Sequence, residues 1–398
     1  MTDLKSKTKL AIITSHPIQY NAPWFALLAK QPAVDLHVFY TWQASENKEI
    51  YDPGFGKTRS WDIPLLEGYN YTFVKNVSHD QGTHHYKGLD NPTLIKQIEE
   101  WGAEAVLIIG WPFKSHFAAM RHFKGKIPVL FRGDSTLLDE TGGLKKMVRR
   151  IMLTYVYSFI DTALYVGSNN KAYFLAHGLK EKELVFCPHA IDNDRFSNAD
   201  DERNKEAISQ RNKLGIGSND FVVLFAGKLE HKKNPEYIIR LSKLLTDSKY
   251  KFVIVGNGPM EEEVKSKAGT DKRIVFVDFQ NQQNMPVVYR MATVFILPSK
   301  GPGETWGLAL NEAMACKRPV VATDKTGGAI DLINENGIII NPHDVSTVAT
   351  YLSTLAADAS KLKTAGEKSF EIIQRFSFNG IVSGICEALD SYKSHAIH

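Results

Sequence analysis

The chain has 398 residues, 43% of them apolar, which is enough for two or three domains with hydrophobic cores. The formal charge of +4 is mild, and no stretch combines dense Lys and Arg with aromatic residues, which argues against a nucleic-acid binder. The chain has three widely spaced cysteines, Cys187, Cys316 and Cys386. Their spacing fits neither a disulfide framework nor a metal site, and it indicates a reducing cytoplasm. The polar N-terminus predicts no signal peptide, and the lack of a long apolar run predicts no membrane-spanning helix.

In the first half of the chain, short apolar runs alternate with helical patterns. Strands are predicted at Leu10–Thr14, Val34–Tyr40, Ala105–Ile109, Val129–Phe131, Ala163–Val166 and Leu184–Cys187. Helices are predicted at Ala22–Ala29, Pro92–Trp101, Gly143–Ile160 and Asn169–His177. Residues 42–90 have weak periodicity, and we interpret them as a long excursion from the first domain.

The second half begins a new series after a charged stretch, residues 198–220, which we interpret as a helix-bearing linker or domain edge. Predicted strands are Phe221–Ala226, Phe252–Val255, Ile274–Val277, Thr293–Pro298 and Pro319–Thr323, with helices at Tyr237–Leu245, Met260–Ala268, Pro286–Met291 and Gly307–Cys316. Uninterrupted apolar strands of this kind are typical of parallel sheets covered on both faces. The chain therefore predicts an α/β protein with two Rossmann-like parallel-sheet domains in series.

The segment from Glu304 to Glu312 joins two predicted strands and places a glycine, Gly307, where a helix begins. A helix start at the carboxyl end of a parallel strand is where α/β folds bind anions, and Gly307 lets an oxygen approach the free N–H groups. Carboxylates repel phosphate, so Glu304 and Glu312 are better suited to hydroxyl groups on either side of it. A ligand with sugar hydroxyls on both sides of a diphosphate is a nucleotide sugar, so this segment predicts a nucleotide-sugar site.

Two further strand ends carry candidate ligand groups. Lys228 and Lys233 follow the strand Phe221–Ala226 and could neutralise a diphosphate, with Asn234 capping the next helix. A solvated lysine cluster would give the same pattern. Gly256 begins a Gly-Asn-Gly turn after the next strand, which is either a plain turn or a wall of the nucleotide site, and it lacks the third glycine of a dinucleotide fingerprint.

These motifs resemble retaining glycosyltransferases of family four, which have the two-domain GT-B fold with a central cleft. The resemblance is carried by Phe225-Ala-Gly-Lys-Leu, Lys233-Asn-Pro, Val255-Gly-Asn-Gly-Pro-Met, Tyr289-Arg-Met-Ala, Leu297-Pro-Ser, Glu304-Thr-Trp-Gly-Leu, Asn311-Glu-Ala-Met-Ala, Asn336-Gly-Ile and Arg375-Phe-Ser-Phe. It covers roughly residues 184–392. The stretch from Cys187 to Phe196 resembles the family's passage between domains, with His189 where Asn is usual.

The resemblance implies a role for each matching residue. Lys233 contacts the diphosphate, Glu312 the ribose hydroxyls and Glu304 the donor sugar, while the amides of Gly307 and Leu308 meet the distal phosphate. Trp306 and Gly256 border the donor, and Lys228 stands where the family usually has Arg, which keeps the charge without the bidentate fork. The residues expected to be catalytic are Glu304, Lys233 and Asp134. The expected domains are 1–190 on the acceptor side, 191–375 for the nucleotide sugar, and 376–398 as a helix crossing back to the N-terminal domain.

The first half matches the family less well. His16, Gln19 and Tyr20 follow the first strand and could hydrogen-bond an acceptor sugar, although a helix-capping turn explains them equally. Arg132 and Asp134 stand where many relatives have a His-Gly pair, and they either meet the acceptor or form an internal ion pair. Residues 42–90 are expected to form a wall on the acceptor side.

The basic stretch from Lys145 to Arg150 leads into an apolar and aromatic helix. Such a helix could contact anionic lipid, but a helix that covers its sheet and leaves its basic start in solvent explains the pattern better. The sequence therefore leaves a peripheral contact with the inner membrane open.

The predicted function is transfer of a sugar, with retention, from a nucleotide diphosphate sugar to a hydroxyl of a glycan or lipid-linked glycan. UDP is the expected nucleotide, bacterial surface polysaccharide synthesis is the expected pathway, and the protein is expected to be cytoplasmic. No cofactor or metal is expected, because there is no Asp-x-Asp motif. The alternatives are a nucleotide-sugar epimerase of similar build and a non-catalytic nucleotide-sugar binding subunit.

Overall fold

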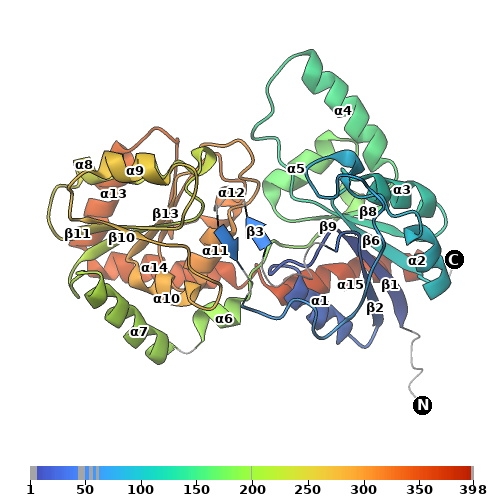
Figure 1. Cartoon of the computed structure of the whole chain (residues 1–398), viewed down its shortest axis with the longest axis horizontal. Helices are drawn as coiled ribbons and strands as arrows, with labels where there is room; N and C mark the ends of the chain where they lie inside the picture. The colour runs from blue at the N-terminus through green and yellow to red at the C-terminus, as the bar shows by residue number, and fades with distance from the viewer. Residues whose placement is uncertain (1–6, 44–49, 53–56, 60–61, 199, 396–398) are drawn as a thin grey trace. The chain divides into compact units, whose positions relative to one another are not determined.

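The computed structural model describes residues 7–43, 50–52, 57–59, 62–198 and 200–395. The chain forms two compact units. Unit 1 comprises the chain up to His189, apart from a small hairpin, together with the chain from Phe378 onward, and unit 2 comprises Ala190–Ser377 together with that hairpin. Each unit is a parallel sheet with helices on both faces (Figure 1).

The sheet of unit 1 has seven strands in the order β5-β2-β1-β6-β7-β8-β9. The strands are β1 (Thr8–Thr14), β2 (Val34–Tyr40), β5 (Asn70–Phe73), β6 (Ala105–Ile109), β7 (Val129–Arg132), β8 (Thr162–Tyr165) and β9 (Leu184–Phe186). The helices are α1 (Ala22–Ala29), η1 (Tyr86–Gly88), α2 (Leu94–Trp101), α3 (Lys114–Phe123), α4 (Leu144–Tyr157), α5 (Ser168–Ala176), η2 (Glu181–Glu183) and α15 (Phe378–His395). Helix α15 packs on α1, β8 and β9.

The sheet of unit 2 has six strands in the order β12-β11-β10-β13-β14-β15. They are β10 (Phe221–Ala226), β11 (Tyr250–Val255), β12 (Ile274–Val277), β13 (Val294–Leu297), β14 (Val320–Thr323) and β15 (Gly337–Ile340), and the separate hairpin is β3 (Ile50–Asp52) with β4 (Lys57–Arg59). The helices are α6 (Asn193–Ser197), α7 (Asp200–Lys213), η3 (His231–Lys233), α8 (Glu236–Leu244), α9 (Glu261–Ala268), α10 (Met285–Met291), α11 (Leu308–Ala315), α12 (Ala329–Leu332), α13 (Ser346–Ala357) and α14 (Ala359–Ile373).

The central strands explain why these sheets form. All six residues of β10 are buried, as are all four of β13, because helices cover both faces and leave no side for polar residues. The predicted α/β class with two parallel sheets is therefore confirmed.

In both sheets the strand order reverses direction next to the first strand. In unit 1 the chain moves outward from β1 through β2 to β5 and then returns to β6 on the other side of β1. In unit 2 it moves from β10 through β11 to β12 and returns to β13. Loops at the carboxyl ends of strands that flank such a reversal diverge and leave room for a ligand. The topology thus selects the loops after β1 and β6 and those after β10 and β13.

Residues 42–90 contain more regular structure than their weak periodicity predicted. Strand β5 pairs with β2 in parallel and extends the sheet of unit 1 at its edge, while the β3–β4 hairpin belongs to unit 2. Two of the four residues of β5 are exposed and the other two are only half-buried, so the strand lacks the apolar run by which inner strands were recognised.

Candidate functional site

In unit 2, the loops after β10 and β13 bring Lys233 and Glu304 into contact. The Lys233 ammonium lies 2.5 Å from Oε2 of Glu304, and the two side chains are only 18% and 8% exposed. The Ser299 hydroxyl donates to the same carboxylate oxygen over 2.9 Å. The cation and the carboxylate predicted for one site therefore form a largely buried ion pair beside the reversal of strand order.

The lysine loop is tied to the end of β13 by its own backbone and by Asn234. The Lys300 amide donates to the Lys232 carbonyl over 2.8 Å, and the Asn234 side chain donates to the Pro298 carbonyl over 3.1 Å. Asn234 has a left-handed backbone (φ 55°), which Asn tolerates better than most residues. The expected capping of α8 by Asn234 is wrong, because its side chain makes no cap hydrogen bond and is used for this cross-link instead.

Gly307 lies at the start of α11 with φ +98°, a left-handed backbone that glycine adopts without strain. A Cβ there would lie 2.7 Å from Thr326 Cγ2 and 2.8 Å from Leu297 Cδ2, so the position also has no space for a side chain. Leu308, the first residue of the helix, is half-buried. The helix therefore begins at the carboxyl end of β13 with its first turn partly open, as an anion site requires.

Glu312 and Trp306 lie deeper. The Tyr289 hydroxyl donates to Oε2 of Glu312 over 2.8 Å, and the Glu312 residue is 4% exposed. Trp306 is 3% exposed, donates its ring N–H to the Asn311 side chain over 2.9 Å and packs against Phe376. The Trp306 ring thus holds the loop between β13 and α11 in place.

Gly256 follows β11 and touches the loop after β10. Its amide donates to the Val277 carbonyl, and a Cβ on it would lie 2.1 Å from the Gly227 carbonyl oxygen. Glycine is required here for close packing of two backbones. Lys228, next to Gly227, is half-buried. Gly256 and Lys228 therefore occupy neighbouring strand ends of the same sheet.

In unit 1, a cavity of about 440 Å³ lies at the carboxyl ends of β6 and β7. Its polar lining includes Asp134, Ser135 and Arg149, and its aromatic lining comprises Trp111, Phe113, Phe131, Tyr157, Tyr173 and Phe174. Aromatic faces beside a carboxylate and a guanidinium suit a ligand with both apolar and hydroxyl-bearing surfaces. Of the predicted site residues, Asp134 lines this cavity.

Apart from Asp134, the residues that line this cavity were not predicted from the sequence. Gly110-Trp-Pro-Phe113 comes directly after the predicted strand Ala105–Ile109, so its position at a strand end was the available signal. Arg149 and Tyr157 come from α4 and give no such signal, because only the packing of this helix brings them to the cavity.

Arg132 and Asp134 have separate partners. The Arg132 guanidinium is buried and donates to the carbonyls of Cys187 over 2.6 Å and Pro188 over 2.8 Å. Asp134 lies 3.5 Å from the His189 ring nitrogen. Burial lowers the pKa of His189, although the neighbouring carboxylate raises it. Arg132 therefore anchors the segment after β9, which the sequence did not predict.

His16, Gln19 and Tyr20 follow β1 and are all half-buried. The His16 ring contacts the Ser15 hydroxyl at 3.0 Å and the edge of Trp42. Burial lowers the pKa of His16, so the ring is neutral at pH 7 and suited to hydrogen bonding. These residues stand beside the strand-order reversal of unit 1.

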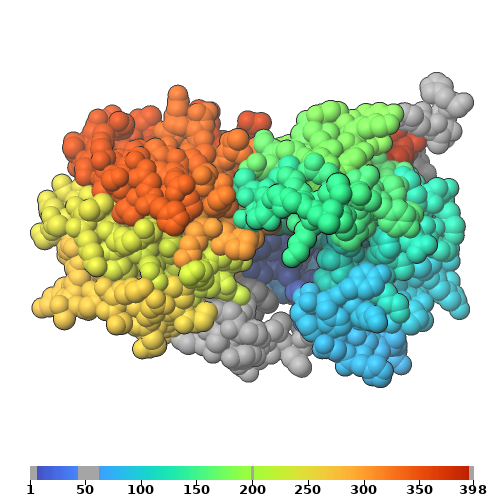
Figure 2. Space-filling view, turned by 90° about the horizontal axis from the view of Figure 1, so that it is seen from above, coloured from blue at the N-terminus to red at the C-terminus, as the bar shows by residue number. Residues whose placement is uncertain are grey.

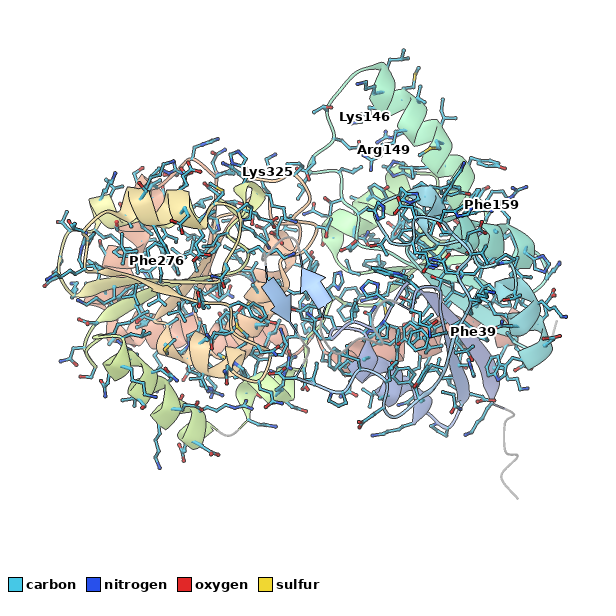
Figure 3. All side chains as sticks on the ribbon, in the orientation of Figure 1. Phe39, Lys146, Arg149, Phe159, Phe276 and Lys325 are labelled. Carbon is cyan, nitrogen blue, oxygen red and sulfur yellow. The ribbon has the colours of Figure 1, made fainter. Side chains whose placement is uncertain are left out.

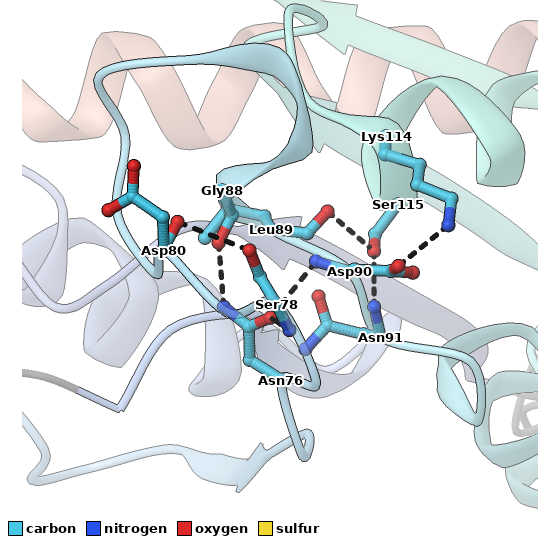
Figure 4. A network of polar contacts seen from close by, with 9 residues as sticks. All are labelled: Asn76, Ser78, Asp80, Gly88, Leu89, Asp90, Asn91, Lys114 and Ser115. Carbon is cyan, nitrogen blue, oxygen red and sulfur yellow. Dashed lines mark hydrogen bonds and ion pairs between the residues drawn. The ribbon is translucent and has the colours of Figure 1, made fainter.

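The segment from Asn76 to Asn91 is closed by its own polar network (Figure 4). Asn76 donates to the Gly88 carbonyl over 2.8 Å and accepts from the Asp90 amide over 3.1 Å. Within the described chain, the side chains that could together hold a metal are Asp80, His84 and His85 of this segment. They belong to unit 1, whereas Lys233 and Glu304 belong to unit 2.

Known proteins resemble this chain in sequence and in fold. Residues 206–371 match the family model of glycosyl transferases group 1. The chain is 28% identical over 213 residues to a D-inositol 3-phosphate glycosyltransferase of Salinispora arenicola, covering 50% of this chain and 47% of that protein. It is also 28% identical over 246 residues to a GDP-mannose-dependent alpha-(1-6)-phosphatidylinositol monomannoside mannosyltransferase of Mycolicibacterium smegmatis, covering 58% of this chain and 62% of that protein. The chain thus spans about half the length of the first of these relatives and under two thirds of the second.

Among solved structures, Anabaena HepE in complex with UDP superposes with a TM-score of 0.71 at 18% identity, over 96% of this chain and 100% of that one. A sucrose-phosphate synthase from Thermosynechococcus elongatus superposes with a TM-score of 0.70 at 16% identity, over 98% and 100%. The expected resemblance to glycosyltransferases of GT-B fold is thereby confirmed.

Proposed function

We propose that this protein is a retaining glycosyltransferase that moves a sugar from a nucleotide diphosphate sugar, with UDP as the nucleotide, to a hydroxyl of a glycan or lipid-linked glycan. The observation that carries the proposal is the Lys233–Glu304 pair, formed by two strand-end loops of the unit that matches group 1 glycosyltransferases. The UDP complex of HepE supports the choice of nucleotide.

In this proposal the donor lies across the carboxyl ends of β10, β11 and β13. Lys233 and Lys228 face the diphosphate, and the amides at Gly307 and Leu308 meet the distal phosphate at the start of α11. Glu304 accepts from hydroxyls of the donor sugar and Glu312 from those of the ribose. The Lys233–Glu304 contact orients the carboxylate before the donor binds.

The transfer breaks the bond between the anomeric carbon and the phosphate oxygen and forms a bond from the same face to the acceptor oxygen. The acceptor proton passes to the departing phosphate, so retention requires no nucleophile from the protein. The negative charge that develops on the leaving diphosphate is stabilised by Lys233, Lys228 and the start of α11. Binding both substrates in a fixed geometry supplies the remaining acceleration.

The acceptor binds in unit 1, where Asp134 lies in the wall of the aromatic-lined cavity and holds the acceptor hydroxyl. His16, Gln19 and Tyr20 contribute further hydrogen bonds at the neighbouring strand end. We place the activity in the cytoplasm, in surface polysaccharide synthesis, and we propose that it needs no divalent metal because two lysines and a helix start neutralise the diphosphate. Three free cysteines, two of them buried, agree with a reducing compartment.

The test compares thermal stabilisation and nucleotide release with UDP-, GDP- and dTDP-sugars, each with and without a chelator. Nucleotide sugars of one nucleotide class should stabilise the protein. The protein should also hydrolyse these nucleotide sugars slowly when the chelator is present. Lys233→Met and Glu304→Gln should each lower turnover by about a hundredfold. Lys368→Met, which breaks an exposed ion pair with Glu371 on α14, is the matched control and should keep full turnover.

Nucleotide binding without turnover in the parent protein, with any acceptor tried, would favour the non-catalytic binding subunit. Release of an epimerised nucleotide sugar would favour the epimerase. Full activity in Glu304→Gln would remove the role assigned to this carboxylate.

A further inference from the structure

Helix α4 of unit 1 exposes an apolar face. Of the fourteen large apolar side chains that are exposed in the described chain, six lie in this one helix, with exposures between 45% and 70%. They are Leu144, Met147, Val148, Ile151, Met152 and Tyr155. Their spacing of three and four residues places them on one side of the helix. Figure 1 shows α4 standing out from its own unit, and Figure 2 views the molecule from that side.

Only the opposite side of α4 packs against the protein. Leu153, Val156 and Tyr157 are buried in the core of unit 1. The helix thus packs on unit 1 through its second half, while its basic first half is mostly exposed to solvent. An exposed apolar stripe of this size on a soluble surface marks an interaction site.

The charges on α4 are all positive. Its sequence contains Lys145, Lys146, Arg149 and Arg150 and no acidic residue (Lys146 and Arg149 are labelled in Figure 3). One nearby carboxylate, Glu140, lies 3.2 Å from Lys146 and 3.7 Å from Arg150. The helix itself therefore carries a net positive charge, with Lys145 and Arg149 exposed.

We propose that α4 docks this protein on an anionic lipid bilayer. The stripe enters the boundary between headgroups and acyl chains, while Lys145 and Arg150 reach anionic headgroups from the flanks of the helix. A second copy of the same face fits less well, because it would bring two sets of cations together. The inference depends on the surface of α4 and stands whether or not the protein transfers sugars.

The position of Arg149 connects this surface with the proposed function. Arg149 projects from α4 into the lining of the cavity that also contains Asp134. A helix lying on a membrane would hold that cavity close to the headgroups. If the proposed function is right, the acceptor is therefore a lipid-linked glycan presented by the same membrane.

Sedimentation with vesicles tests the docking without any sugar donor. The full-length protein should bind vesicles of phosphatidylcholine and phosphatidylglycerol, bind pure phosphatidylcholine less, and release as salt rises. Val148→Glu/Ile151→Glu should weaken binding by at least about tenfold. Both side chains are exposed, so the fold should persist. Ile208→Glu/Leu244→Glu changes two exposed apolar residues of unit 2 and adds the same charge, and it should bind like the parent.

Equal vesicle binding by the parent and the α4 variant would overturn the proposal, as would no binding to anionic vesicles. Concentration-dependent dimers that the α4 substitutions abolish, with no vesicle binding, would assign the face to a second copy of the chain. Donor hydrolysis is measured separately and should be the same in the α4 variant. Vesicle binding without any donor hydrolysis would support the docking of α4 on the bilayer and contradict the proposed function.

Discussion

The Tyr289 hydroxyl donates a hydrogen bond to Oε2 of Glu312 over 2.8 Å, and both side chains are buried. The two residues lie on neighbouring helices, α10 and α11. The carboxylate proposed to bind the ribose is therefore held in one orientation before any donor arrives.

Replacing Tyr289 with Phe should consequently weaken donor binding. Loss of one hydrogen bond to a buried carboxylate should lower the free energy of unfolding by about 1–2 kcal/mol and the donor affinity by about tenfold. Denaturant unfolding and nucleotide titration measure these effects. Tyr237→Phe removes the hydroxyl that donates to the Asp344 carbonyl in the same unit and should cost stability only. Equal loss of donor affinity in both variants would show that Tyr289 acts only through stability.

Gly307→Ala should destabilise unit 2 more than Gly303→Ala. Both glycines have positive φ, +98° and +87°, so each substitution pays the backbone strain of about 1 kcal/mol. A Cβ at Gly307 also meets two side chains within 3 Å, whereas nothing lies within 4 Å of one at Gly303. The additional cost from overpacking should be about 1–3 kcal/mol. Denaturant unfolding of the two variants checks the difference, and equal losses would contradict the clash.

Stability should fall as the pH falls below about 6.5, because His116 is buried and neutral. Its ring lies 2.7 Å from the Gly110 carbonyl oxygen and 3.0 Å from the Thr41 hydroxyl, and burial lowers its pKa from 6.5 to about 4. The unfolded chain therefore binds this proton between pH 6.5 and 4 while the folded chain does not. The loss reaches about 3 kcal/mol once the pH has fallen through 4, where the folded chain binds the proton as well.

Four further histidines should also make the protein less stable as the pH falls, because burial lowers their pKa values as well. They are His16, His37, His177 and His189. Urea unfolding at pH 7.5, 6 and 5 would measure the combined slope. His116→Gln should be less stable at pH 7.5 and should have a flatter slope below pH 6.5. An unchanged slope in that variant would exclude His116 as a source of the pH dependence.

Asp134→Asn should separate acceptor use from donor binding. The side chain lines the aromatic cavity, so its loss should lower transfer to the acceptor by about a hundredfold and leave nucleotide binding unchanged. Asp161→Asn is the control, because Asp161 pairs with Lys124 and accepts from the Val129 amide in a structural role. Initial rates with varied acceptor measure the effect. A change in nucleotide affinity in Asp134→Asn would contradict an acceptor-side role.

The sequence predicted the inner strands well, because a strand buried on both faces has to be a continuous apolar run. Strand β15 was not recognised although Ile338, Ile339 and Ile340 form a short apolar run, and strand β5 has no such run. Strand β5 was not recognised because its exposed and partly polar residues resemble those of a loop.

The candidate site was predictable as a set of strand ends but not as a geometry. Lys233 and Glu304 follow strands that are adjacent in the sheet, although β11 and β12 lie between them in the chain. No local pattern reveals that adjacency, so their contact could not be derived. The same holds for Arg132, whose carbonyl partners follow a strand two positions away in the sheet.

Helix α15 has a consequence for the order in which the protein folds during synthesis. Unit 1 is not continuous in sequence, because α15 follows the whole of unit 2 and yet packs on α1, β8 and β9. Gly384 lies so close that a Cβ there would come within 2.4 Å of the Phe186 carbonyl oxygen. The ribosome releases all of Ala190–Ser377 before unit 1 can be completed. Unit 2 should therefore become protease-resistant first on a nascent chain, reversing the usual N-terminal-first order.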